Sequence, residues 1–283
     1  MYVMKTRLLS NYTENILHIG EDQITTYVFG NGKKTVFLFP PFPHSGLLYM
    51  LFYAICPEYD VRYVTLDLPG WIGKSENSYK YGFSYERLMK IIRYFIDYYS
   101  TGKFSVLGFS FGTSIAIQIP RIYKNRVKNV VLVSPVVNGK LIHSYPKAIL
   151  LDYLKKKKLY GISSIYVKSR FKKYKQELIN SGFPKQFIDT YFSLFEMMDM
   201  KIVMNSLNNL FSANFSDDIK YLDKVDSMIV NSIDEPHIFI EQADYLRKIL
   251  RSEKSSFLIG SHEDFLLFPD KYRLSNILNF VTK

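Results

Sequence analysis

One stretch of nine residues restricts the possible folds of this chain more than any other. Residues 104–112 read Phe-Ser-Val-Leu-Gly-Phe-Ser-Phe-Gly, so Ser110 lies two positions from a glycine on each side. This spacing is typical of a strand that turns sharply into a helix, because small residues at 108 and 112 allow the two elements to approach closely. The Ser110 hydroxyl would then stand above a sheet, beside a helix N-terminus that favours negative charge. A five-residue pattern also occurs by chance, so its context must support it.

The rest of the chain alternates short apolar runs with segments of helical periodicity. Ser84–Tyr99, Phe111–Tyr123, His237–Leu250 and Tyr272–Val281 carry the helical pattern, with Ser84 as a cap and Pro120 as a kink or early stop. The apolar runs are short and rich in β-branched or aromatic residues, as expected of strands that are buried on both faces. They are Thr26–Phe29, Val36–Phe39, Val61–Leu66, Phe104–Leu107, Val130–Val133, Met228–Val230 and Ser256–Ile259. This order predicts an α/β fold with a mostly parallel sheet and helices on both of its faces.

One interval interrupts the alternation. Residues 136–226 contain no convincing strand and show helical patterns rich in Lys, Tyr, Phe and Met. Ninety residues cannot form a plain loop in a compact domain. We therefore expect a core of residues 1–135 and 227–283, with residues 136–226 inserted as a helical lid.

A serine nucleophile needs a base, and the base needs a carboxylate to orient it. Asp234 follows the predicted strand Met228–Val230, and His262 follows the predicted strand Ser256–Ile259. Active sites of open α/β sheets lie at these carboxyl ends. We expect Ser110, Asp234 and His262 to form a catalytic triad, with Glu235 and Asp264 as competitors for the role of the acid.

With Ser110, Asp234 and His262 in this order, the chain resembles an α/β-hydrolase with a lid over nearly its whole length. Residues 67–75, Asp-Leu-Pro-Gly-Trp-Ile-Gly-Lys-Ser, resemble the family's D-x-P-G-x-G-x-S segment, with one extra residue between the glycines. The resemblance implies a sheet of eight strands, a structural role for Asp67, and an oxyanion hole formed by the backbone N–H groups of Phe42 and Phe111.

The segment that would supply the Phe42 donor departs from the family pattern. Residues 39–44 read Phe-Pro-Pro-Phe-Pro-His, and Pro40 and Pro41 replace the usual His-Gly. Two backbone donors are lost as a result, although Phe42 keeps its N–H. His44 and Trp71 are candidate substrate contacts near the same site.

These residues predict a serine hydrolase that cleaves a carboxylic ester or thioester through an acyl-enzyme, without a cofactor or metal. The apolar residues of the lid favour a hydrophobic acyl or aryl group. The same triad also supports a C–C bond hydrolase, a peptidase similar to proline iminopeptidase, or a cofactor-free lyase. A ligand receptor or scaffold that retains the triad without turnover is an alternative from a different class.

Charge and composition restrict the partners. The 283 residues carry a net charge of +11. The segment from Lys147 to Glu177 contains ten Lys or Arg residues and only two acidic residues, Asp152 and Glu177. This segment is either a solvated helical face or a site that attracts an anionic or carrier-bound substrate. No nucleic-acid motif accompanies the positive charge. With Cys56 as the only cysteine, no apolar run long enough to span a membrane, and no signal segment, we expect a cytoplasmic protein.

Overall fold

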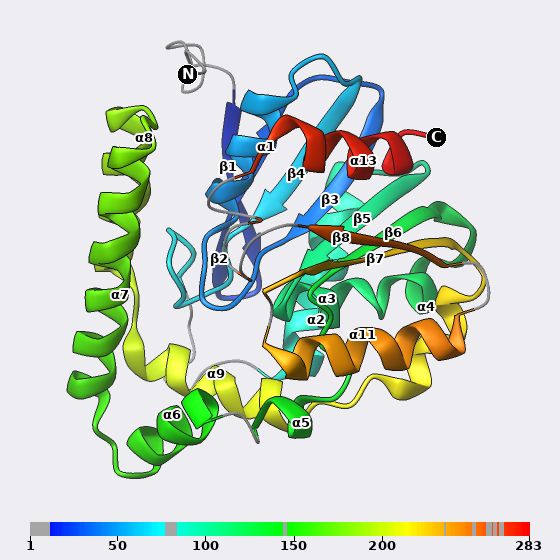
Figure 1. Cartoon of the computed structure of the whole chain (residues 1–283). Coiled ribbons are helices and arrows are strands. Elements are labelled where there is room, and N and C mark those ends of the chain that lie inside the picture. Colours follow the sequence, from blue (N-terminus) through cyan, green and yellow to red (C-terminus); the bar gives the residue numbers. More distant parts are fainter. Residues whose placement is uncertain are drawn as a thin grey trace.

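A single twisted sheet of eight strands organises the molecule (Figure 1). The computed structural model describes residues 12–76, 84–143, 146–234, 236–250, 253–258, 262, 265 and 269–283. The strand order is β1-β2-β4-β3-β5-β6-β7-β8. The strands are β1 (Tyr12–Ile19), β2 (Asp22–Phe29), β3 (Lys34–Phe39), β4 (Val61–Leu66), β5 (Phe104–Phe109), β6 (Val127–Val133), β7 (Asp226–Ser232) and β8 (Glu253–Leu258).

The sheet is mostly parallel, as predicted. Strand β3 pairs with β4 and β5 in parallel, and β5 through β8 continue in parallel, whereas β1 and β2 form an antiparallel edge. Each of the seven apolar runs overlaps one of the strands β2 through β8, and Ile259, at the end of the last run, lies outside the described residues. Strand β1 was not predicted. Only Leu17 of β1 is fully buried, so the strand has no apolar run to reveal it.

Helices cover both faces of the sheet (Figure 1), and the sheet separates two apolar clusters. The helices of the core are α1 (Met50–Ile55), α2 (Tyr85–Tyr99), α3 (Phe111–Ala116), α4 (Ile119–Tyr123), α11 (His237–Ile249) and α13 (Lys271–Val281). The Ser84 hydroxyl accepts a hydrogen bond from the N–H of Arg87 and caps α2, as expected. The predicted helix after Ser110 is broken into α3 and α4, and Pro120 lies in the first turn of α4.

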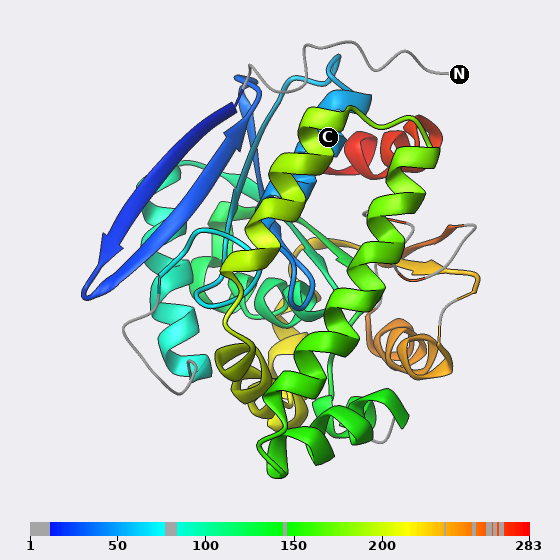
Figure 2. The same cartoon turned by 90° about the vertical axis from the view of Figure 1, so that its left-hand side faces the viewer.

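Helices fill the interval between β6 and β7 (Figure 2). They are α5 (Gly139–His143), α6 (Pro146–Lys156), α7 (Tyr160–Asn180), α8 (Lys185–Leu194), α9 (Met200–Ser212) and α10 (Ile219–Leu222). Buried side chains of α7 and α8 join one apolar cluster, and those of α9 join the other. None of the helices in the described ranges is long and apolar enough to cross a membrane.

Candidate active site

Ser110 occupies a strained turn between β5 and α3. Its backbone angles are φ 50° and ψ −115°, a left-handed conformation that a side chain rarely adopts. A Cβ added to Gly108 would lie 2.4 Å from the Gly112 carbonyl oxygen, and one on Gly112 would lie 2.1 Å from that of Phe39. Both glycines are therefore required by close backbone approach, as the sequence pattern predicts.

Thr113 stabilises this turn from inside the helix. Its hydroxyl donates to the carbonyl oxygen of Ser110 and accepts a hydrogen bond of 2.8 Å from the Val136 N–H. The Ser110 N–H donates to the Val133 carbonyl oxygen at 2.9 Å. The strained residue is thus held by two neighbouring segments, and its side chain is half-buried at the carboxyl edge of the sheet.

The other predicted members of the triad follow strands of the same edge. Asp234 lies in the turn after β7, and His262 lies in a turn after β8. The His262 ring packs against Phe239, with centroids 4.4 Å apart, and against Phe109, with centroids 5.0 Å apart. Since Phe109 immediately precedes Ser110, the structure brings His262 to the serine turn.

The role of Asp234 has less support from its surroundings. Its side chain is exposed, and no hydrogen bond or ion pair joins it to another residue within the described ranges. Its competitors, Glu235 and Asp264, lie outside the described residues. The choice of the acid therefore rests on the position of Asp234 after β7.

One aromatic side chain, that of Trp71, contacts both residues predicted to supply the oxyanion donors. The Trp71 ring packs edge-on against Phe42, with centroids 5.0 Å apart, and against Phe111, with centroids 4.8 Å apart. Trp71, a candidate substrate contact from the sequence, is fully buried. Neither the Phe42 nor the Phe111 N–H donates a hydrogen bond to another described residue, as a site for an oxyanion requires.

Asp67 anchors the loop that follows β3. Its buried carboxylate accepts hydrogen bonds from the Tyr27 hydroxyl at 2.7 Å, the Gly46 N–H at 3.0 Å and the Lys74 N–H at 2.8 Å, and from the Ser45 hydroxyl. Burial raises the pKa of Asp67 to about 6, and these donors oppose the increase. The structural role expected for Asp67 is confirmed by these contacts.

His44 extends from the same loop towards the helical insertion. Its Nδ1 lies 2.7 Å from the Tyr191 hydroxyl of α8, and its ring packs against Phe171 of α7 with centroids 5.3 Å apart. Burial lowers the pKa of His44 to about 3, and the charge of nearby His262 acts in the same direction. His44 is therefore a neutral, half-buried group beside the catalytic candidates.

Sequence reasoning missed the importance of Tyr191 and Phe171 at this contact. Both are buried aromatic residues on helices, and their local patterns are those of ordinary core positions. Only the three-dimensional placement of α7 and α8 against residues 39–45 brings them to His44. No signal along the chain could have distinguished them from other apolar residues of the insertion.

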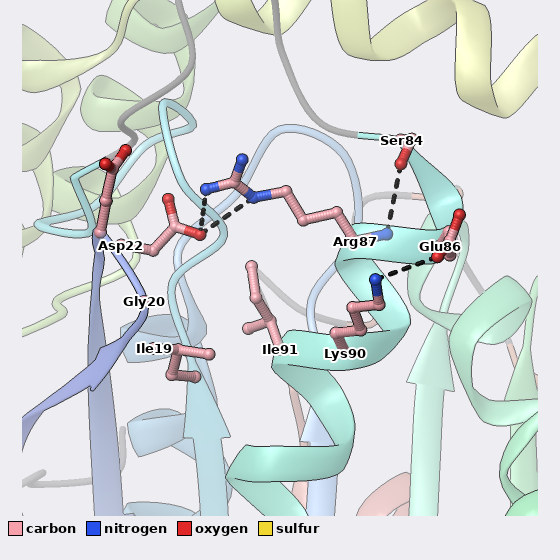
Figure 3. A pocket seen from close by; sticks show the side chains of 9 residues that line it. Ile19, Gly20, Asp22, Ser84, Glu86, Arg87, Lys90 and Ile91 are labelled. Carbon is pink, nitrogen blue, oxygen red and sulfur yellow. Dashed lines mark hydrogen bonds and ion pairs between the residues drawn. The ribbon is translucent and has the colours of Figure 1, made fainter.

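An open hollow of about 750 Å³ lies between the β1–β2 turn and the start of α2 (Figure 3). Arg87 spans it and donates to Asp22, with its Nε at 3.0 Å, and Lys90 pairs with Glu86 at 3.0 Å. The Arg87–Asp22 pair joins α2 to β2, whereas the Lys90–Glu86 pair lies within α2. None of the residues proposed for catalysis lines the hollow, whose walls are Ile19, Gly20, Glu21, Asp22, Ser84, Glu86, Arg87, Lys90 and Ile91.

Comparisons with known proteins agree with this arrangement. Residues 34–267 match the family model described as the alpha/beta hydrolase fold. A poly(3-hydroxyalkanoate) depolymerase of Ectopseudomonas oleovorans is 28% identical over 149 residues, a match that covers 52% of this chain and 48% of that protein. The match therefore spans only about half the length of this relative.

Two solved structures share the architecture over nearly the whole chain. An enol-lactonase of Burkholderia xenovorans superposes with a TM-score of 0.76 at 13% identity, covering 95% of this chain and 100% of that one. A bromoperoxidase of Bacillus anthracis superposes with a TM-score of 0.71 at 17% identity, covering 96% and 100%. At such low identities these similarities concern the fold alone.

Proposed function

The chain belongs to the alpha/beta hydrolase fold family, and on this premise we propose that it is a serine hydrolase of carboxylic esters or thioesters. The observation that carries the proposal is the strained Ser110 turn, with the His262 ring packed against the residue before it. A strained serine at the end of a strand presents its hydroxyl to a substrate. A histidine at the same sheet edge is suited to take its proton.

In the proposed reaction, Ser110 Oγ attacks the acyl carbon while His262 accepts the serine proton. Asp234 orients the imidazole and stabilises its positive charge. The backbone N–H groups of Phe42 and Phe111 donate to the oxyanion, and one such donor contributes about 3–4 kcal/mol to transition-state stabilisation. His262 then protonates the leaving group, and a water molecule activated by His262 releases the acyl group from Ser110.

The surroundings favour a substrate with a hydrophobic acyl or aryl group. Phe171 and Tyr191 lie on α7 and α8 beside His44, so aromatic side chains of residues 136–226 face the loop that carries Phe42. We propose that residues 136–226 act as a lid and that His44 contacts the substrate, with Trp71 supporting the site from behind. The name of the depolymerase relative refers to a polyester, which agrees with ester chemistry.

A fluorophosphonate probe tests the nucleophile directly. The wild-type protein should react with the probe and hydrolyse a p-nitrophenyl ester, and Ser110→Ala should lose both activities. Ser193→Ala, which removes an exposed hydroxyl from α8, is the matched control and should react normally. Labelling of Ser110→Ala at the wild-type rate would refute the assignment of Ser110.

A second pair of variants tests the acid. Asp234→Asn should lower kcat by at least about a hundredfold with little change in KM, because the imidazole loses its orienting carboxylate. Asp223→Asn, at a surface turn before β7 and therefore at the opposite end of that strand, should behave as wild type. A normal kcat for Asp234→Asn would transfer the role to another acid, and Glu235→Gln and Asp264→Asn are the next variants to measure.

A further inference from the structure

The outer side of α6 and of the first turns of α7 exposes an unusual number of large apolar side chains. Six of the sixteen exposed large hydrophobic residues in the described ranges fall within residues 149–165. We call this set the α6–α7 surface. It comprises Ile149 (52% exposed), Leu150 (47%), Tyr153 (54%), Leu159 (38%), Ile162 (52%) and Ile165 (70%).

These side chains are not needed for the internal packing of the helices. Helix α6 already buries Leu154, and α7 already buries Ser163, Phe171 and Leu178 on its inner side. An exposed amphipathic helix normally carries polar residues on its outer face. Apolar side chains clustered on the outer face therefore indicate a surface that meets another apolar phase.

Lysines surround the apolar set. Lys157 and Lys158 lie between α6 and α7, and Lys168 and Lys172 continue along the exposed side of α7. Within the described ranges none of these four lysines forms an ion pair. The two acids nearby are already engaged, since Asp152 pairs with Lys155 and Lys156, and Glu177 pairs with Lys173.

We propose that the α6–α7 surface docks on an anionic lipid bilayer, with its isoleucines in the headgroup region and its lysines on the lipid phosphates. Apolar side chains bordered by lysine are the pattern by which helices bind such interfaces. Helices α6 and α7 lie at the border of the molecule, on the left-hand side of Figure 1. An acidic carrier protein would instead use the lysines without requiring Ile162 and Ile165 to be buried.

This inference does not depend on the proposed hydrolase activity, since binding to lipid can be measured without turnover. It has a consequence for the site, however. Helix α7 carries Ile165 on its outer side and Phe171, which contacts His44, on its inner side. A protein docked in this way would hold its inserted helices between the bilayer and the site.

Sedimentation with vesicles tests the proposal. Wild-type protein should bind vesicles containing about 30% phosphatidylglycerol at low salt, and should bind pure phosphatidylcholine far more weakly. Ile162→Ser combined with Ile165→Ser should weaken binding at least about tenfold. Lys157→Gln combined with Lys168→Gln should weaken it by a similar factor.

Matched controls make the same kinds of substitution at exposed positions away from the α6–α7 surface. Ile16→Ser removes an isoleucine of 54% exposure from β1, and Lys103→Gln combined with Lys128→Gln removes two exposed lysines elsewhere. Both controls should bind vesicles as wild type does. Circular dichroism should show that all variants are folded, as expected for exposed positions.

Three results would overturn the proposal. The first is an absence of binding to the anionic vesicles at low salt. The second is binding of the Ile162→Ser/Ile165→Ser variant to vesicles as strong as that of the wild type, which would show that only nonspecific charge attraction is involved. The third is a concentration-dependent dimer, or a complex with an acidic acyl carrier protein, that is lost in the isoleucine variant while vesicles remain unbound.

Discussion

At Gly112 the backbone of α3 touches the backbone of β3. A methyl group at this position would lie 2.1 Å from the Phe39 carbonyl oxygen. Because backbone atoms cannot move aside cheaply, Gly112→Ala should lower the free energy of unfolding by at least about 3 kcal/mol. Chemical denaturation monitored by circular dichroism measures this change.

The control for Gly112 is another glycine with free space around it. A Cβ on Gly161 of α7 meets no atom within 4 Å. Gly161→Ala should therefore raise the free energy of unfolding by about 0.5 kcal/mol through helix propensity. Equal stability of the two variants would show that the contact with Phe39 is not close.

His44 gives the protein a specific sensitivity to acid. Its pKa is about 3 in the folded state, below the usual value near 6.5, so the unfolded chain binds the proton more readily between these values. Stability from a neutral His44 is present above pH 6.5 and is lost as the pH falls towards 3. Between pH 7 and 4.5 the wild type should lose about 2 kcal/mol more than His44→Gln.

Urea denaturation at several pH values measures this difference. His18→Gln, which removes an exposed histidine from β1, is the control and should follow the wild type. Parallel pH profiles for wild type and His44→Gln would mean that His44 is solvated.

The raised pKa of Asp67 works in the opposite direction, because a proton bound by the folded state below pH 6 adds stability there.

Among the residues, those that depend on local backbone chemistry were predictable. The positions of Gly108, Ser110 and Gly112 follow from the turn that they form, and the hydrogen bonds of Asp67 agree with its expected structural role. The contact of His44 with Tyr191 was not predictable, since 147 positions separate the partners. The triad and oxyanion assignments remain predictions, and the variants above test Ser110 and Asp234.

At the scale of elements, the contact between α8 and the loop after β3 depends on few polar atoms. The Tyr191 hydroxyl lies 2.7 Å from His44 Nδ1, two residues after Phe42. Tyr191→Phe removes this hydrogen bond and should lower the free energy of unfolding by about 1 kcal/mol. It should also lower kcat/KM for a p-nitrophenyl ester by about tenfold, because the Phe42 N–H is positioned less accurately.

Tyr272→Phe is the control for the loss of a hydroxyl, since Tyr272 of α13 is 80% exposed. It should match the wild type in both measurements. Rate measurements over a range of substrate concentrations separate the effects of Tyr191→Phe on kcat and on KM. A change confined to KM would place Tyr191 in substrate binding, whereas a change in kcat would support its role in positioning the loop.

Elements were predictable where burial leaves a pattern. Strand β4 has the predicted bounds, Val61–Leu66, because all but one of its residues are buried. Strand β1 was not found, because only Leu17 among its residues is fully buried. Apolar character alone does not show which face of an element meets the core when the element lies at an edge.

The charge of the whole molecule should influence the encounter with anionic substrates. Much of the net charge of +11 comes from residues 147–177, where ten Lys or Arg residues stand against two acidic residues. If the charge steers substrates, kcat/KM for an acyl-CoA thioester should fall about tenfold from low to high salt. A neutral p-nitrophenyl ester with the same acyl group is the control, and its kcat/KM should change little.

Similar salt dependence for the two substrates would show that the basic segment does not attract anions to the site.

The architecture itself was predictable at this scale, because alternating strands and helices permit few sheet topologies. What the site acts on could not be read from the chain. Under the proposed lid role, that property depends on contacts such as those of His44 with Tyr191 and Phe171, which join segments far apart in the sequence.

Helix α7 has one further consequence, for protein engineering. One face of the helix carries buried residues such as Phe171 and Leu178, and another face carries exposed residues such as Ile165 and Lys172. Positions on opposite sides of a helix are usually independent when they share no contact. A library confined to positions 167, 171 and 174 should therefore alter substrate preference while adsorption to surfaces stays constant, and one confined to 162, 165 and 168 should do the reverse.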